Sequence, residues 1–191
     1  SPDGRELAVS KDDDIWIASI DGGRASLSPL AETPDVQERW PEFSPDGQWL
    51  AYAANGSGQH EVYVQPHPGP GPRTQVSRSG GTSPAWSPTG RELFFVSLPD
   101  PEGRRDMMVI DVRLGPSLVV GEPRRLFGFS PAELWFHCIP VRCYGVSADG
   151  REFFVRRLLP QPSPRPVARV PLVLGWAEEL RTRVPAGPER Y

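Results

Sequence analysis

The sequence has few cysteines, almost no lysine and no long apolar run, and these shortages narrow the class of protein. Cys138 and Cys143 are its two cysteines, too few for a disulfide framework. Lys11 is the single lysine among 21 cationic residues, a bias that we attribute to GC-rich coding. No apolar run approaches the roughly 18 residues of a membrane span, so we expect no membrane segment within this chain.

Strong net charge is lacking as well. A net charge of −3 is too small to indicate a nucleic-acid partner. The charge is uneven, because residues 1–65 carry twelve acidic and four basic residues, whereas residues 66–191 carry twelve acidic and seventeen basic ones. We interpret this asymmetry as a difference between the solvent-facing strand positions of successive sheets.

Helix-length apolar stripes are absent before the last fifteen residues. The 24 prolines and 19 glycines mostly separate short apolar runs, so they mark turns between strands rather than a disordered chain. This pattern indicates an all-β fold.

One four-residue turn recurs along the chain. Residues 44–47 read Ser-Pro-Asp-Gly, residues 1–4 repeat them fully, and residues 87–90 and 147–150 match in three positions, with the glycines 43, 43 and 60 residues apart. Proline presets the backbone of a type I turn, and glycine takes the left-handed conformation that closes a hairpin. Apolar residues alternate after each turn. Four short antiparallel strands in about 43 residues are typical of one β-propeller blade.

The repeat predicts a partial propeller of about four blades, each a four-stranded antiparallel sheet, over residues 1–176. A short capping helix at residues 177–184 and a tail follow, within residues 177–191. The first unit lacks its inner strand, and the fourth shows no clear outer strand. The expected strands span residues 6–10, 15–20, 25–30, 39–43, 49–53, 61–64, 74–76, 84–86, 92–96, 107–112, 124–127, 143–146, 152–155 and 170–174.

Five aromatic residues recur in phase with these strands. We expect them to form the core between blades rather than a stacking platform for nucleic acid. They are Trp16, Trp40, Trp49, Tyr63 and Trp86. Trp135 is out of phase, because it lies in an insertion within residues 128–142, and we consider it a candidate for exposure and function.

The repeat begins with an aromatic residue, the Ser-Pro-Asp-Gly turn and an apolar strand, and an acidic residue before Ile-Trp or Val-Tyr follows. This pattern resembles the WD-like repeat of TolB-type propellers. The likeness covers nearly the whole chain. Residues 170–184, with Gly-Trp-Ala-Glu-Glu-Leu at 175–180, look like the tail of propellers fused behind bacterial serine/threonine kinase domains. Such propellers are binding scaffolds, so the resemblance implies no catalytic residue. Thr89 and Ala148 depart from the turn pattern. The intact propeller is expected to have more blades and further domains upstream.

Tests for chemistry give no catalytic, cofactor or metal site. Residues 128–132 come nearest to a nucleophile elbow but lack its second glycine. His137, Cys138 and Cys143 fit no zinc spacing, and we expect Cys143 to be a buried apolar residue rather than a metal ligand or half of a disulfide. The acidic run at residues 12–14 is interpreted as a solvated hairpin loop.

Geometry directs the search for function to one face. The four turns should lie on one face of the propeller. The loops between second and third strands and the connections between blades should lie on the other, which we call the loop face. Rigid scaffolds commonly carry function on such loops, and exposed arginine and tryptophan are typical binding hot spots. The candidate anchors for a protein or peptide partner are Arg104, Arg105, Trp135, His137, Arg142, Arg156 and Arg157.

Three functions fit these features of the sequence. The first is a non-catalytic scaffold for protein or peptide binding or sensing, in a kinase-linked signalling protein or a TolB-like envelope protein. The second is the propeller of a prolyl-oligopeptidase-like serine peptidase, which the predicted helix and polar tail disfavour. The third is a stand-alone propeller that binds a ligand or carbohydrate. We expect a periplasmic or otherwise extracytoplasmic location rather than a cytoplasmic one.

Overall fold

The four recurring turns adopt the predicted conformation in the computed structural model of the protein. In each, the glycine N–H donates to the carbonyl of the serine three residues earlier, at 2.8–3.0 Å. The glycines have φ angles of 70–75°, a region that favours glycine because it lacks a Cβ. The side chain of Asp46 also stabilises the turn. It accepts hydrogen bonds from the Ser44 hydroxyl at 2.5 Å and from the Gln48 N–H at 3.1 Å.

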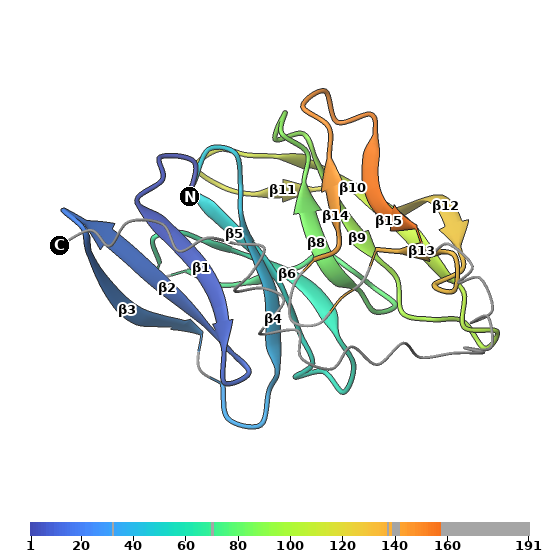
Figure 1. Cartoon of the computed structure of the whole chain (residues 1–191), viewed down its shortest axis with the longest axis horizontal. Coiled ribbons are helices and arrows are strands. Elements are labelled where there is room, and N and C mark those ends of the chain that lie inside the picture. Colours follow the sequence, from blue (N-terminus) through green and yellow to red (C-terminus); the bar gives the residue numbers. More distant parts are fainter. Residues whose placement is uncertain (32, 70, 137, 139–141, 158–191) are drawn as a thin grey trace, which may run out of the picture. The chain divides into compact units, whose positions relative to one another are not determined.

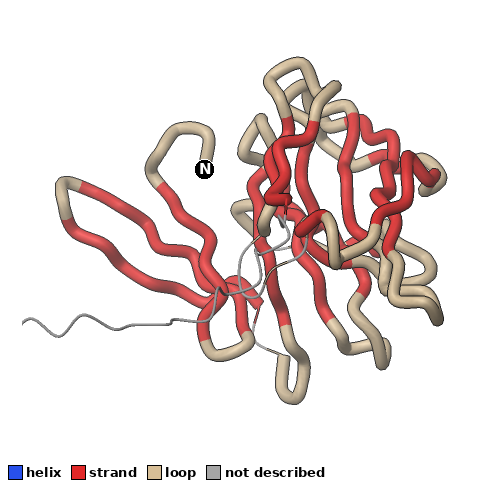
Figure 2. The backbone as a smooth tube through the Cα atoms, turned by 45° about the vertical axis from the view of Figure 1, so that its right-hand side comes forward, coloured by secondary structure: helices blue, strands red, loops and turns tan. Residues whose placement is uncertain are grey.

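The structure describes residues 1–31, 33–69, 71–136, 138 and 142–157. This part of the chain is made of strands and loops and contains no helix (Figure 2). The strand expected at residues 170–174 and the helix expected at 177–184 lie outside it. The described residues belong to one compact unit, Ser1–Leu158.

The first sheet has three antiparallel strands in the order β1 (Glu6–Lys11), β2 (Asp14–Asp21) and β3 (Arg24–Ala31). Among the described residues, β1 has no strand on its other edge, as expected for a unit without an inner strand. The second sheet is complete, with β4 (Glu38–Phe43), β5 (Trp49–Ala54), β6 (Glu61–Pro66) and β7 (Thr74–Gln75) in sequential order.

The third sheet repeats this plan and adds to it. Its strands are β8 (Thr82–Trp86), β9 (Glu92–Val96), β10 (Arg105–Arg113), β11 (Val119–Val120) and β12 (Arg124–Phe129). Both β11 and β12 pair with β10, along different parts of its length. The sequence predicted β12 but not β11, which is only two residues long.

The fourth sheet departs from sequential order. It runs β13 (Leu134–Trp135), β15 (Phe153–Arg157), β14 (Tyr144–Val146). Part of the insertion expected as loop is therefore a strand, β13, which precedes β14 in the chain but pairs with β15. It lies next to β15 where the third strand lies in the second and third sheets.

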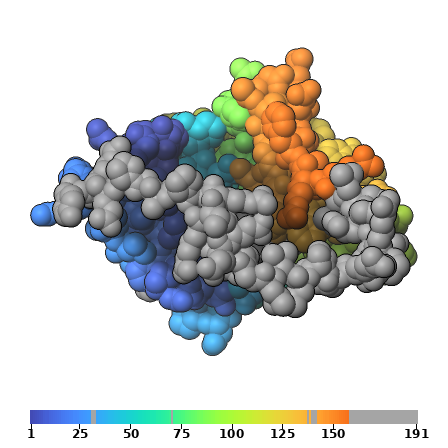
Figure 3. Space-filling view, viewed as in Figure 1, coloured from blue at the N-terminus to red at the C-terminus, as the bar shows by residue number. Residues whose placement is uncertain are grey.

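The sheets follow one another in chain order, from blue to orange in Figure 3. Three clusters of buried side chains lie between them. Members of these clusters, from the first space to the last, are Ile15 with Leu50, Trp49 with Leu93, and Phe94 with Tyr144. The predicted aromatic core is largely confirmed: Trp40, Trp49, Tyr63 and Trp86 are buried, whereas Trp16 is half-buried.

The repeated turns and the loops between the second and third strands lie at opposite ends of the sheets. The four repeated turns lie at the upper end in Figure 1, and the loops between β1 and β2, β5 and β6, and β9 and β10 lie at the lower end. Gln37, in a connection between sheets, donates from its backbone to Asn55 Oδ1 at 2.7 Å and from its side chain to Asp13 Oδ2 at 3.2 Å. These hydrogen bonds join loops of the first and second sheets on the loop face.

Candidate functional site

A groove of about 330 Å³ opens on the loop face between the third and fourth sheets. Most of its wall is apolar, and it contains one cationic side chain. The lining residues are Pro99, Gly103, Arg105, Phe129, Pro131, Leu134, Trp135 and Phe136. They come from the β9–β10 hairpin, the end of β12 and the segment that contains β13.

A local reversal of the chain builds the apolar wall. After β12 ends, Leu134 N–H and Glu133 N–H both donate to the Ser130 carbonyl at 3.0 Å, which turns the chain into β13. Strand alternation then points successive side chains in opposite directions. Phe136 is 2% exposed and packs against the ring of Phe129 at 4.5 Å, whereas Trp135 is 37% exposed.

Arg156 stacks on the exposed tryptophan. Trp135 and Arg156 are cross-strand partners in the β13–β15 pair, and the guanidinium carbon lies 5.2 Å from the indole centroid. A cation over an indole face is attracted by the ring quadrupole, so the contact stabilises this arrangement of the two side chains. Arg157, the next residue, pairs with Leu134 and is exposed.

Arg105 lies on the opposite side of the groove, at the start of β10. Its Nη1 donates to the Ser97 carbonyl at 2.9 Å, and the residue is half-buried. Burial lowers the pKa of its guanidinium below the usual value, because removing water disfavours the charged form. Within the described part of the chain, neither Arg105 nor Arg156 has an ion pair with a carboxylate.

Arg104 is engaged within its own hairpin. Its Nε donates to Asp100 Oδ2 at 3.0 Å, and its Nη2 lies 3.3 Å from Glu102 Oε2. These contacts are exposed and local, so they occupy the guanidinium that was predicted as an anchor. Arg104 does not line the groove.

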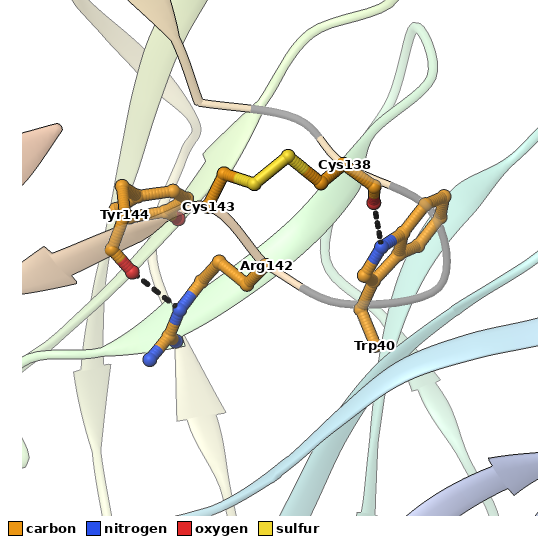
Figure 4. Close-up of a disulfide and its surroundings, with 5 residues drawn as sticks. All are labelled: Trp40, Cys138, Arg142, Cys143 and Tyr144. Atoms are coloured by element: carbon orange, nitrogen blue, oxygen red, sulfur yellow. Dashed lines mark hydrogen bonds between the residues drawn. A yellow bond between two sulfur atoms is a disulfide. The ribbon is translucent and has the colours of Figure 1, made fainter. Parts of the chain in front are cut away.

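Arg142 lies apart from the groove, among the inner strands. Its Nη1 donates to Glu42 Oε2 and, at 3.1 Å, to the Pro84 carbonyl, while its Nε donates to the Tyr144 carbonyl at 2.9 Å. Figure 4 shows the side chain running back beside Tyr144. Burial raises the pKa of the Tyr144 phenol, whose hydroxyl donates to the Ser83 carbonyl at 2.8 Å. This arrangement joins three sheets.

The expectation for the cysteines was wrong. Cys138 and Cys143 form a disulfide with Cα atoms 5.5 Å apart, so Cys143 is not a buried free thiol. The Trp40 indole N–H donates to the Cys138 carbonyl at 2.7 Å (Figure 4). The bridge therefore holds both the contact to Trp40 and the segment that carries Arg142.

The structure brings three of the seven predicted anchors together: Arg105, Trp135 and Arg156. Arg105 and Trp135 line the groove, whereas Arg156 reaches it only through its contact with Trp135. Arg157 is the next residue and does not line the groove, Arg104 and Arg142 are bound elsewhere, and His137 lies outside the described residues. Sequence reasoning missed the apolar wall, formed chiefly by Phe129, Leu134 and Phe136. The available signal was the density of apolar residues in the insertion.

Other hollows are less suited to a ligand. One of about 460 Å³ lies beside the unpaired edge of β1 and is lined in part by Trp40, Glu42 and Arg142, which already bind one another or neighbouring strands. Another, of about 710 Å³, is lined by Asp12 to Asp14 and residues 33–37. Among the described residues, no group of three or more His, Cys, Asp or Glu side chains is placed to hold a metal ion. Nor is any helix there long and apolar enough to span a membrane.

Comparison with known proteins supports the fold. No family model matches the chain. A TolB-like protein from Agrobacterium tumefaciens superimposes with a TM-score of 0.58 at 23% identity, over 83% of this chain and 57% of that one. The described sheets are therefore those of a TolB-like β-propeller, and they do not close into a ring.

Two curated relatives are similar in sequence. Tricorn protease homolog 1 of Streptomyces coelicolor is 34% identical over 95 residues, which are 48% of this chain and 8% of that protein. A second tricorn protease homologue of the same organism is 33% identical over 111 residues, 56% of this chain and 8% of the relative. The chain thus matches less than a tenth of either relative's length. The expected link to kinases stays a prediction.

Proposed function

We propose that this propeller segment is a non-catalytic scaffold that binds a protein or peptide segment through the groove beside Trp135. The observation that carries the proposal is the meeting of an exposed Trp135, stacked by Arg156, with an apolar wall and Arg105 on the loop face. Trp and Arg are the side chains most enriched among binding hot spots, and binding sites are mostly apolar with a few placed polar groups.

The size of the groove favours a peptide as the ligand. A volume of about 330 Å³ takes one or two side chains and leaves the rest of a ligand on the surface. The wall is also held before any ligand arrives, because the β13–β15 pair and the rings of Phe129 and Phe136 fix it. Preorganisation of this kind lowers the entropy cost of binding.

The intact protein has two candidate settings, a sensing protein and a peptidase. In the first, it is a TolB-like envelope protein or a kinase-linked signalling protein, in which the propeller senses a partner. The disulfide supports an extracytoplasmic location, because such bonds persist in oxidising compartments.

A second candidate function is favoured by one observation, the 34% identity to a tricorn protease homologue. In that case the segment is the propeller domain of a peptidase and would bind segments of the peptidase's substrates. The rest of the open reading frame separates the two settings: an upstream kinase catalytic loop supports the first, and a protease domain in the same chain supports the second.

Panning a random peptide library displayed on phage, followed by calorimetry on the selected peptides, tests the proposal. Trp135→Ala should weaken their binding by at least about tenfold, as expected for a hot spot. Phe154→Ala is the matched control, because Phe154 is an aromatic residue on β15 that is 64% exposed and does not line the groove. Selection of no peptide, or equal affinity for the protein and its Trp135→Ala variant, would overturn the proposal.

A further inference from the structure

We infer that the groove selects peptide segments in which an apolar side chain stands next to a carboxylate, from Asp, Glu or a chain terminus. This inference rests on the proposed peptide-binding function and names the chemistry of its ligand. It follows from the charges of Arg105, which lines the groove, and Arg156, which stacks on Trp135, and from the apolar wall beside them.

Among the described residues, Arg105, which lines the groove, and Arg156, which stacks on Trp135, lack acidic partners, unlike three arginines nearby. Arg125 on β12 pairs with Asp106 at 2.8 Å, and Arg124 pairs with Glu92 at 3.1 Å. Arg104 pairs with Asp100 and Glu102. By contrast, Arg105 and Arg156 make no ion pair within the described residues. Their positive charge is therefore available to a ligand.

Partial burial makes the lack of an acidic partner costly for Arg105. A cation that is half removed from water gains most from a carboxylate partner, since hydrogen bonds between ions of opposite charge are about twice as strong as neutral ones. One Nη of Arg105 is fixed on the Ser97 carbonyl, which orients the planar guanidinium. A guanidinium held in this way suits the two oxygens of a carboxylate.

The apolar part of the ligand follows from the wall. Phe129 and Phe136 are 7% and 2% exposed, so they form a closed floor, and Leu134 and Trp135 border it. Arg156 covers one face of the indole at 5.2 Å. An aliphatic or aromatic side chain can enter the groove while an adjacent carboxylate reaches an arginine.

A nucleic acid or another polyanion fits less well. Binding to phosphates requires a continuous cationic surface, because affinity grows with the number of phosphates neutralised. Here Asp100 and Glu102 stand in the hairpin that also carries Arg105, and they would repel a chain of phosphates. The surroundings therefore favour a single carboxylate.

An array of capped heptapeptides of the form Ser-Gly-Xaa-Zaa-Gly-Ser-Gly tests the inference on the full chain. Xaa is each apolar or aromatic residue in turn, and Zaa is Asp, Glu, Asn, Gln or Lys. For the residue Xaa that binds best, calorimetry should show that changing Glu to Gln at Zaa weakens binding by about tenfold or more. Raising the salt concentration should weaken the binding of the acidic peptide and leave the binding of the amide peptide nearly unchanged.

Three variants assign the effect to the groove. With Arg105→Gln or Arg156→Gln, the ratio of the affinities for the acidic and the amide peptide should fall to less than about threefold. Arg157→Gln removes the same charge from the next position of β15, whose side chain alternates away from that of Arg156 and makes no cation–π contact with Trp135, and it should keep the full ratio of affinities. Circular dichroism checks that each variant is folded.

The outcomes separate the two proposals. If acidic and amide peptides bind equally and Trp135→Ala still abolishes binding, the carboxylate inference is wrong and the peptide-binding function stands. If Arg157→Gln reduces the ratio as strongly as Arg156→Gln, the preference is a general charge effect and the inference is again wrong. If no peptide of the array or of the phage library binds, the function itself fails.

Discussion

Arg142 forms an ion pair with Glu42, which precedes it by 100 residues, and so ties the entry of the fourth sheet to the inner strand of the second. The Trp86 N–H donates to the same carboxylate at 3.2 Å, and the Trp86 indole donates to the Glu42 carbonyl at 3.1 Å. Glu42 is thus shared by three successive sheets. Contacts of this kind hold blades together where the sheets do not close into a ring.

Loss of this ion pair should destabilise the protein. Arg142→Met leaves the Glu42 carboxylate without its cation in a site where the two side chains are only 25% and 30% exposed, so we expect a loss of about 2 kcal/mol. Urea unfolding measures it. Arg124→Met, at an arginine side chain that is 51% exposed, should cost less than about 1 kcal/mol. Equal losses would show that the inner pair has no special role.

The disulfide should contribute stability beyond its own loop. In the loop-entropy treatment, closing a loop of about six residues stabilises by about 2 kcal/mol, and the Trp40 hydrogen bond to Cys138 depends on the same loop. Thermal unfolding with and without dithiothreitol should therefore show a clear drop in midpoint on reduction. The Cys138→Ser/Cys143→Ser double variant should have the lower midpoint and not respond to the reductant. An unchanged midpoint on full reduction would contradict this account.

Gly47 should be hard to replace for a backbone reason. Its φ of +72° favours glycine, so Gly47→Ala should cost about 1 kcal/mol or more, although the nearest atom to an added Cβ is 3.4 Å away. Gly145→Ala is the control, because no atom lies within 4 Å of its added Cβ and its φ is not positive. Peptide binding should survive Gly47→Ala, since the turn lies on the face opposite the groove. A loss of binding in a folded variant would count against that assignment.

The pH dependence of stability should contain a contribution from Glu38. This residue is fully buried, and burial raises the pKa of its carboxyl above the usual value near 4.5. The folded state therefore binds the proton more tightly than the unfolded state. Stability from this group is present below pH 4.5 and is lost as the pH rises through the folded pKa.

Glu38→Gln removes that titration. The free energy of unfolding of the variant, relative to the original protein, should thus increase as the pH rises from about 4 to about 8. Denaturant unfolding at several pH values measures the difference. A difference that stays constant with pH for Glu38→Gln would refute the assignment.

Local features made most of the fold predictable from sequence. The turn is defined by four adjacent residues, and the apolar runs of β5 and β9 each lie within six residues, so both can be read without knowing the partners. The strand β13 could not be found in this way. It has two residues, and its stability comes from pairing with Arg156 and Arg157, about twenty residues later.

The same distinction applies to the site. Trp135 was found because it falls outside the repeat, a property of the sequence itself. The sequence could not show which arginines lack an acidic partner, because such partners lie far away in the chain, as Glu42 does from Arg142. The disulfide was missed because the spacing of two cysteines does not show whether the chain reverses between them and brings their Cα atoms to bonding distance.

Hydrogen–deuterium exchange of the full chain, with and without a saturating selected peptide, tests the central claim most directly. We expect slower exchange in residues 129–136 and 99–105, which form the groove, and no change in the turns at residues 44–47 and 147–150. Protection of those turns with an unchanged groove would contradict the account, because the partner would then bind the face that we assign to structure alone.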